Sequence, residues 1–273
     1  MLLVNGRELE ITRFPDNTFK FDLEKIDEEN EIIWHFESME ELFTLIGLAD
    51  KFSQVKTKLF MPYMPNARMD KTQDESEGFM LKYLVQTLDN LGFDEIEILD
   101  PHSEVYKRWT KKTKWTQNDE LVKDLIKRSE SIIKLSSGEE VTFVYPDNGA
   151  RNRYSSMLGS NNDLYGVKER DQATGEIISF DLVGDVPEGP VLIVDDICSK
   201  GGTFYYTAKK LREKGFKGEI YLYITHAEET IKEGKLLRDD SEITKVFTTN
   251  SILNKALHKI TKFTLEGEIN YEL

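Results

Sequence analysis

Short apolar runs alternate with longer amphipathic segments along most of the chain. Seven runs are rich in β-branched or aromatic residues and end at turn residues, which predicts strands. These runs span 56–63, 95–100, 139–146, 189–196, 218–226, 245–249 and 259–265. Apolar residues three and four positions apart predict helices over 38–54, 77–92, 118–135 and 201–215. This alternation predicts an α/β fold with two mainly parallel sheets, each flanked by helices.

Local signals refine this outline. The chain's 273 residues favour about two domains, which we divide as 1–125 and 126–273. The opening segment 1–24 has the pattern of a β-hairpin or meander, and 158–190 contains a candidate hairpin. Ser38 followed three residues later by Glu41 predicts a capping box at the start of the first helix.

Composition narrows the class of protein. The 29 aromatic residues (15 Phe, 11 Tyr and 3 Trp) are enough for a substantial core. The net charge of −14 disfavours general capture of nucleic acid. The sequence contains no run of 18 apolar residues, so it predicts no membrane-spanning helix, and no signal peptide is visible. A single cysteine, Cys198, excludes an intramolecular disulfide. We therefore expect a cytoplasmic protein without membrane or nucleic-acid partners.

One segment carries the clearest chemical signal. A buried strand, 191–194, ends in Asp195 and Asp196, and a turn then leads to Gly201, Gly202 and Thr203 at the start of a helix. Ligands of open α/β sheets bind at the carboxyl ends of strands. Two carboxylates suit ribose hydroxyls or a hydrated magnesium ion, and a glycine turn before a helix suits a phosphate. The alternative is that this segment forms only a helix cap and a tight turn and binds no ligand. The chain contains no P-loop, no dinucleotide-binding glycine motif and no cysteine–histidine spacing typical of zinc.

This segment, VLIVDDICSKGGTF, resembles the ribose-phosphate loop of the phosphoribosyltransferase superfamily. Further segments resemble, in order, those of the ribose-phosphate diphosphokinases. They are RFPDNTF (13–19), MPYMPNARMDK (61–71), ILDPHSE (98–104), VYPDNGARNR (144–153) and VKERD (167–171). The resemblance implies two phosphoribosyltransferase-like domains, the first carrying ATP-binding segments and the second the ribose-phosphate loop.

The resemblance also implies an activity. The family transfers the β,γ-diphosphate of ATP to the anomeric hydroxyl of ribose 5-phosphate, giving phosphoribosyl diphosphate and AMP for nucleotide or NAD metabolism. It implies magnesium as cofactor. It also implies a homo-oligomer, at least a dimer, because segment 13–19 reaches a neighbouring subunit's ATP site.

Site residues carried over from the resemblance fall into four groups. Lys168 and Arg170 are the catalytic cations, and their spacing in an extended chain puts them on one face. ATP is bound by Phe14, Asp16, Arg68, Met69, Asp70 and His102. The metal is held by His102 and Asp147. The ribose phosphate is bound by Asp195, Asp196, Ser199, Lys200, Gly201, Gly202 and Thr203. The residues themselves also allow Phe14 to be a core aromatic, His102 a surface histidine and Asp147 a turn residue.

Departures from the family pattern affect the choice of acceptor. Ser199 and Lys200 replace an Asp-Thr pair, while Thr18, Met69 and Lys71 replace Glu, Gln and Arg. The added cation at Lys200 motivates ADP-ribose as an alternative acceptor. A phosphoribosyltransferase, which has no need of ATP segments, and a catalytically silent partner are further alternatives. We interpret His226 and Cys198 as structural residues.

Overall fold

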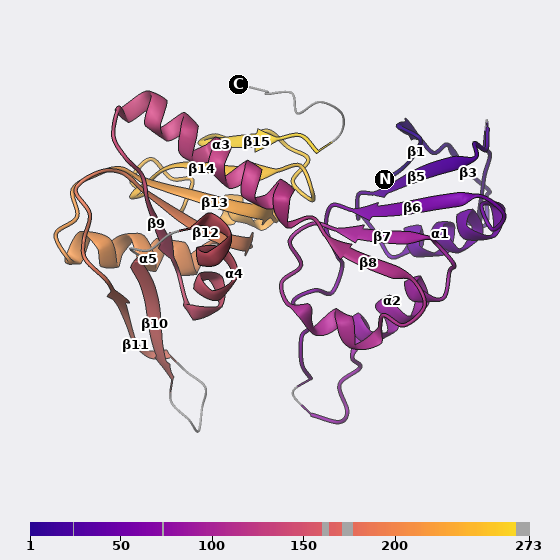
Figure 1. The fold of residues 1–273 in the computed structure, drawn as a ribbon, viewed down its shortest axis with the longest axis horizontal. Coiled ribbons are helices and arrows are strands. Elements are labelled where there is room, and N and C mark those ends of the chain that lie inside the picture. Colours follow the sequence, from indigo (N-terminus) through magenta and orange to yellow (C-terminus); the bar gives the residue numbers. More distant parts are fainter. Residues whose placement is uncertain (24, 73, 160–163, 171–176, 266–273) are drawn as a thin grey trace. The chain divides into compact units, whose positions relative to one another are not determined.

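The computed structural model describes residues 1–23, 25–72, 74–159, 164–170 and 177–265 (Figure 1). The chain divides into two compact units, Met1–Asn118 and Asp119–Leu273. The boundary predicted after residue 125 falls inside helix α3 (Asp119–Ser137), which belongs wholly to the second unit.

The first unit is built on a six-stranded sheet in the order β2-β1-β5-β6-β7-β8. Its strands are β1 (Leu2–Val4), β2 (Arg7–Glu8), β5 (Glu29–Trp34), β6 (Lys56–Met61), β7 (Glu95–Ile98) and β8 (Lys114–Gln117). Strands β5 to β8 are parallel, while β1 is antiparallel to both of its neighbours. A separate hairpin joins β3 (Ile11–Arg13) to β4 (Phe19–Phe21). The opening segment therefore contains two hairpins, as its pattern indicated.

Helices α1 (Glu40–Lys51) and α2 (Met80–Asp89) and the short 3₁₀ helix η1 (Glu104–Trp109) complete this unit. The predicted capping box is wrong in its first half, because α1 begins at Glu40 with Met39 as N-cap and no side-chain cap. The second half of the motif is present, because Glu41 bonds back to the backbone of Ser38, but it also bonds to a further residue. Its carboxylate accepts hydrogen bonds from the backbone N–H of Glu37 at 3.0 Å and of Ser38 at 3.4 Å.

The second unit is built on a seven-stranded sheet in the order β11-β10-β9-β12-β13-β14-β15. Its strands are β9 (Thr142–Tyr145), β10 (Leu164–Arg170), β11 (Ile177–Val183), β12 (Val191–Cys198), β13 (Ile220–Ala227), β14 (Ile243–Thr249) and β15 (Ile260–Phe263). All are parallel to their neighbours except β11, which is antiparallel to β10. Both sheets thus confirm the predicted α/β fold.

Helices cover this sheet on two faces. They are α3, α4 (Asn148–Leu158), α5 (Gly202–Glu213) and the 3₁₀ helix η2 (Glu229–Glu233). Val191 and Ile193 of β12 pack in one core cluster with Phe204 and Leu211 of α5. The intervening residues of β12 are also fully buried, so this strand is covered on both sides, as expected for a central parallel strand.

Helix α4 was not predicted. The run Asp147-Asn148-Gly149 is typical of a turn, and the helix is mostly polar. Its buried residues Ala150, Tyr154 and Leu158 nevertheless recur every four positions, which is the spacing of a one-sided helix. None of the helices in the described part of the chain is long and apolar enough to cross a membrane.

Candidate functional site

The two aspartates at the end of β12 lie where the sequence predicts them, but in different surroundings. Asp196 is buried, and its Oδ2 lies 3.9 Å from Nη1 of Arg153 on α4. Asp195 is partly exposed, and its Oδ1 accepts a hydrogen bond from the backbone N–H of Asp196 at 3.0 Å. Arg153 is therefore an electrostatic partner that the sequence did not single out, because it comes from a helix that was not predicted.

Several effects raise the pKa of Asp195 well above the ordinary carboxyl range. Removal of its carboxyl group from water contributes most, followed by the negative charge of Asp196 and then that of Asp147. Asp147 follows β9, the parallel neighbour of β12, so the two strand ends bring these carboxylates to one edge of the sheet. The result is a negative cluster suited to hydroxyl donors or a hydrated cation.

Replacing Asp195 with asparagine is expected to stabilise the protein at neutral pH. A raised pKa means that the folded chain binds this proton more tightly than the unfolded chain. The free energy of unfolding therefore falls as pH rises from the ordinary carboxyl range through the folded pKa. The introduced amide carries no charge, so the gain should be present at pH 7 and shrink toward pH 4. Urea unfolding across this range measures it, with Asp185→Asn as the exposed control. Equal stability of the Asp195→Asn and Asp185→Asn variants at pH 7 would contradict the assignment.

The two glycines of the loop have different roles. Gly201 is the N-cap of α5 with φ of 74°, and a Cβ there would lie 2.1 Å from Cδ1 of Leu236. Gly202 has no heavy atom within 4 Å of its would-be Cβ. Gly201 is thus required by the backbone, whereas Gly202 leaves space in front of the helix N-terminus. Free N–H groups and the helix dipole make that position favourable for a phosphate.

Lys200, the added cation, already has a partner. Its Nζ lies 3.1 Å from Oε2 of Glu233 on η2. Both side chains are largely exposed, at 67% for Lys200 and 50% for Glu233. The sequence could not indicate this pair, because the two residues are separated by α5 and β13.

The segment with Lys168 and Arg170 forms the outer hairpin of the sheet. On β10, Lys168 lies opposite Phe180 and Arg170 opposite Ile177, with an irregularity in the register between them. Near the base of the hairpin, a Cβ on Gly166 would lie 2.3 Å from the carbonyl oxygen of Pro146. The hairpin therefore starts in direct contact with the backbone that precedes Asp147. Residues 171–176, which include the end of the predicted VKERD segment, lie outside the described residues.

Asp147 has a structural function that the turn pattern only partly indicated. It is the N-cap of α4, and its Oδ1 accepts a hydrogen bond from the backbone N–H of Ala150 at 3.1 Å. A carboxylate at the N-cap interacts favourably with the helix dipole. Its charge also reaches Asp195. The residue is thus a helix cap that contributes to the negative cluster.

In the first unit, the two remaining segments follow neighbouring parallel strands. Arg68 is exposed in the turn after β6, and the partly exposed His102 follows β7. The backbone N–H of Leu99 donates to the carbonyl of Met61 at 3.2 Å, which joins the two strand ends. Both segments therefore leave the same edge of the sheet.

Met69 and Asp70 lie in the same turn as Arg68. Met69 packs against the core of the first unit, and its sulfur accepts a hydrogen bond from the backbone N–H of Met80 at 3.1 Å. Met69 thus connects the turn to the N-terminus of α2. Asp70 is partly exposed.

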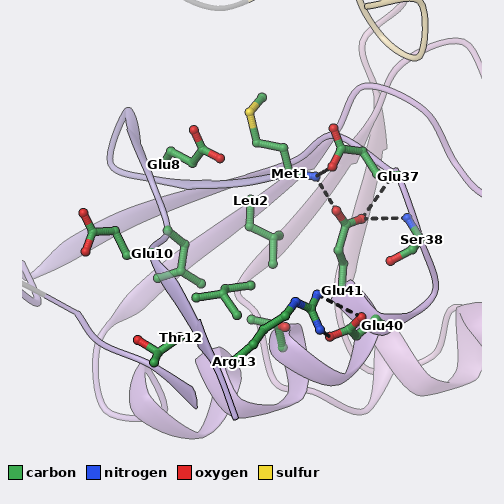
Figure 2. A pocket seen from close by; sticks show the side chains of 13 residues that line it. Met1, Leu2, Glu8, Glu10, Thr12, Arg13, Glu37, Ser38, Glu40 and Glu41 are labelled. Carbon is green, nitrogen blue, oxygen red and sulfur yellow. Dashed lines mark hydrogen bonds and ion pairs between the residues drawn. The ribbon is translucent and has the colours of Figure 1, made fainter. Parts of the chain in front are cut away.

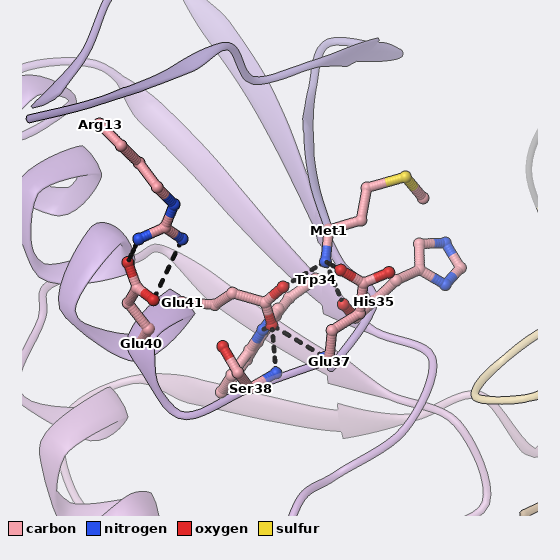
Figure 3. Close-up of polar contacts among 8 residues, drawn as sticks. All are labelled: Met1, Arg13, Trp34, His35, Glu37, Ser38, Glu40 and Glu41. Carbon is pink, nitrogen blue, oxygen red and sulfur yellow. Dashed lines mark hydrogen bonds and ion pairs between the residues drawn. The ribbon is translucent and has the colours of Figure 1, made fainter. Parts of the chain in front are cut away.

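The tip of the β3–β4 hairpin carries Phe14 and Asp16. Phe14 is 45% exposed, which excludes the alternative of a core aromatic. Asp16 accepts hydrogen bonds from the hydroxyl and the backbone N–H of Thr18, and these lower its pKa. Arg13, at the base, forms two hydrogen bonds to Glu40 of α1, at 2.7 and 3.1 Å (Figure 3). The hairpin is therefore fixed to α1 and presents its tip to solvent.

A cavity of about 610 Å³ lies beside this hairpin (Figure 2). Five of its charged groups pair with one another. The amino group of Met1 contacts Glu37 and Glu41, and Arg13 contacts Glu40. None of the predicted binding residues lines it. The cavity therefore gives no support for an ATP site at this place.

His226 and Cys198 are structural, as interpreted. His226 is 2% exposed, and its Nδ1 lies 2.8 Å from Oγ of Ser251. Cys198 is buried in the core cluster below the loop. Within the described residues, no group of three or more histidine, cysteine, aspartate or glutamate side chains could hold a metal ion.

No family model matches the chain. It is 29% identical over 254 residues to the ribose-phosphate pyrophosphokinase of Pyrococcus abyssi, covering 89% of this chain and 84% of that one. It is 29% identical over 232 residues to the enzyme of the same name from Sulfurisphaera tokodaii, covering 80% and 72%. The solved structure of phosphoribosylpyrophosphate synthetase from Mycobacterium smegmatis has a similar fold, with a TM-score of 0.68 and 20% identity over 95% of this chain and 86% of that one.

Proposed function

From its similarity to ribose-phosphate pyrophosphokinases, we propose that the chain is a divergent member of that family and that it transfers the β,γ-diphosphate of ATP to the anomeric hydroxyl of a 5′-phosphorylated ribose. Ribose 5-phosphate is the proposed acceptor, with phosphoribosyl diphosphate and AMP as products. The observation that carries the proposal is the edge of the second sheet. There, two aspartates, a glycine loop at a helix N-terminus and the base of the Lys168 hairpin follow adjacent strands.

Each part of this edge has a role in the proposed reaction. Asp195 and Asp196 accept hydrogen bonds from the ribose hydroxyls, and the first backbone N–H groups of α5 bind the 5′-phosphate. The anomeric oxygen bonds to the β-phosphorus as the bond to the α,β-bridging oxygen breaks and AMP leaves. Negative charge then grows on the phosphoryl oxygens, and Lys168 and Arg170 stabilise it.

Magnesium fits the donor set of the second unit. This ion usually takes one or two protein carboxylates and completes its shell with water and substrate phosphates. Asp147 and Asp195, whose charges act on each other, supply such carboxylates. When bound with ATP, the ion neutralises phosphate charge.

ATP binding is proposed for the first unit. The turn with Arg68, Met69 and Asp70 and the segment with His102 leave one edge of its sheet. We further propose that the exposed tip of the β3–β4 hairpin, with Phe14 and Asp16, covers the adenine bound to a neighbouring copy in a homo-oligomer.

Product analysis tests the proposal directly. The protein is incubated with ATP, magnesium and ribose 5-phosphate, and the products are identified by mass spectrometry. We expect AMP and phosphoribosyl diphosphate in equal amounts, and neither in the presence of excess chelator. Formation of ADP in place of AMP, or undiminished activity with chelator, would contradict the proposed chemistry.

ADP-ribose is the second candidate acceptor, because the exposed Lys200 departs from the family loop at the position next to the 5′-phosphate. If ribose 5-phosphate is the acceptor, Lys200→Thr should leave activity on it largely intact, because any contact of Lys200 with the phosphate is offset by the loss of its ion pair with Glu233. If ADP-ribose is the acceptor, the same change should reduce its use about tenfold, the scale of one charge-assisted hydrogen bond. Competition between the two acceptors in one reaction gives the ratio of kcat/KM values. Absence of turnover on both would favour the catalytically silent alternative.

A further inference from the structure

The loop before α5 is held in place by a segment that follows β13. This segment, residues 228–236, contains η2 and the turn after it, and we refer to it as the strap. The backbone N–H of Glu228 donates to the carbonyl of Cys198 at 2.9 Å, which joins the start of the strap to the start of the loop. The two segments therefore leave the sheet side by side.

Further along the strap, backbone contacts are too close for a larger residue. A Cβ on Gly234 would lie 1.9 Å from the carbonyl oxygen of Lys200, so the strap backbone passes directly against the loop backbone. The Leu236 side chain fills the space next to Gly201 and is completely buried. The backbone of Lys200 is thus fixed from two sides.

The Lys200 side chain is held in a different way. Its ammonium group pairs with the half-exposed carboxylate of Glu233, at 3.1 Å, rather than with a buried group. Ion pairs between exposed side chains contribute little to stability and exchange readily with other partners. The structure therefore combines a fixed loop backbone with a lysine that can change partner at small cost.

We propose that Glu233 is a specificity-determining residue of the ribose-phosphate loop. It holds Lys200 when the loop is empty and loses it to the 5′-phosphoryl group of an entering acceptor. This inference rests on the proposed function of the loop as a phosphate site. A phosphate monoester carries more negative charge than a carboxylate, and the N-terminus of α5 favours that charge. A sugar without the phosphoryl group offers Lys200 no competing negative charge, so the ion pair with Glu233 should stay intact.

Glu233 then acts as an internal competitor. Its carboxylate weakens the binding of a phosphorylated acceptor, because the ion pair must break first. It has no such effect on an unphosphorylated sugar. Removing the charge at residue 233 should strengthen binding of the phosphorylated acceptor, and the gain should require Lys200.

The test is a double-mutant cycle measured by titration calorimetry at low ionic strength. Glu233→Gln should tighten binding of ribose 5-phosphate about three- to fivefold, the scale of an exposed ion pair, without tightening binding of ribose. In turnover assays, KM for the acceptor should fall while kcat changes little. In the Lys200→Met background, Glu233→Gln should change affinity by less than about twofold.

Glu229→Gln is the matched control. It removes the same charge from the same short helix, but Glu229 pairs with Lys232 at 3.4 Å and Lys255 at 3.0 Å. The affinity of this variant should stay close to that of the unmodified protein. An equal gain from Glu229→Gln, or a full gain from Glu233→Gln without Lys200, would overturn the proposal and point to a general field effect.

The outcomes separate this inference from the proposed reaction. The expected binding pattern without AMP formation would leave Glu233 as the internal competitor and overturn the diphosphokinase activity. AMP formation without this binding pattern would support the diphosphokinase activity and overturn the role of Glu233 as internal competitor. ADP-ribose is titrated in parallel, and failure of the unmodified protein to bind either acceptor would overturn both.

Discussion

Lys168→Ala is expected to lower turnover about a hundredfold or more, while ATP binding changes much less. In the proposed reaction, charge on the transferring diphosphate increases between the bound state and the transition state. A cation placed against that charge therefore contributes mainly to kcat. Steady-state kinetics with saturating ATP, together with a direct ATP titration, measures the two effects.

Lys214→Ala is a suitable control for this variant. Lys214 lies at the end of α5 and pairs with Asp181 of β11, so the change removes a lysine near the same hairpin without touching the proposed site. The turnover of this variant should match that of the unmodified protein. A Lys168→Ala turnover within about threefold of the unmodified protein would exclude Lys168 from the mechanism.

Gly201→Ala should lower the free energy of unfolding by about 2–5 kcal/mol. The left-handed backbone costs a non-glycine residue about 1–2 kcal/mol. Overpacking against Leu236 adds about 1–3 kcal/mol, because the new Cβ would lie 2.1 Å from a buried side chain. Denaturant unfolding measures the loss. Acceptor binding should fall as well, because the loop that holds the phosphate must shift.

A second glycine separates the two costs. Gly215 has φ of 92°, and no heavy atom lies within 4 Å of its would-be Cβ. Gly215→Ala should therefore show the backbone cost alone. The double variant Gly201→Ala, Leu236→Ala should lose less stability than the sum of the single variants. Equal losses for Gly201→Ala and Gly215→Ala would show that contact with Leu236 has no energetic role.

The sequence predicted strands well where the buried residues form one continuous apolar run. Each of the seven predicted strands overlaps an observed one, because a central parallel strand is apolar along most of its length. Strand β5 was missed, although it is a parallel strand of the first sheet with buried residues. Strand β8 was also missed, since its segment is basic. Strand β8 is fixed by distant polar groups, among them the Asp89 carboxylate, which accepts from the Trp115 side chain and from the backbone N–H of Thr113. Such contacts leave no local periodicity.

The same distinction applies to the site. Asp195, Asp196 and the glycine loop could be identified because strand, carboxylates and turn are contiguous in the chain. Arg153, Glu233 and Leu236 could not be identified, because each reaches β12 or the loop after it from another helix or turn. Their roles depend on tertiary packing, which no local pattern encodes.

The close contact between Gly166 and Pro146 fixes the position of the β10–β11 hairpin at its base. A single methyl group on residue 166 would therefore shift the residues of β10 that follow it, including Lys168. Changes in the number of residues between β10 and β11 would leave this contact undisturbed. Among natural variants of this chain, the length of the segment between β10 and β11 should therefore differ, while residue 166 stays as small as glycine. Sequencing of close relatives can examine this expectation without any assay of activity.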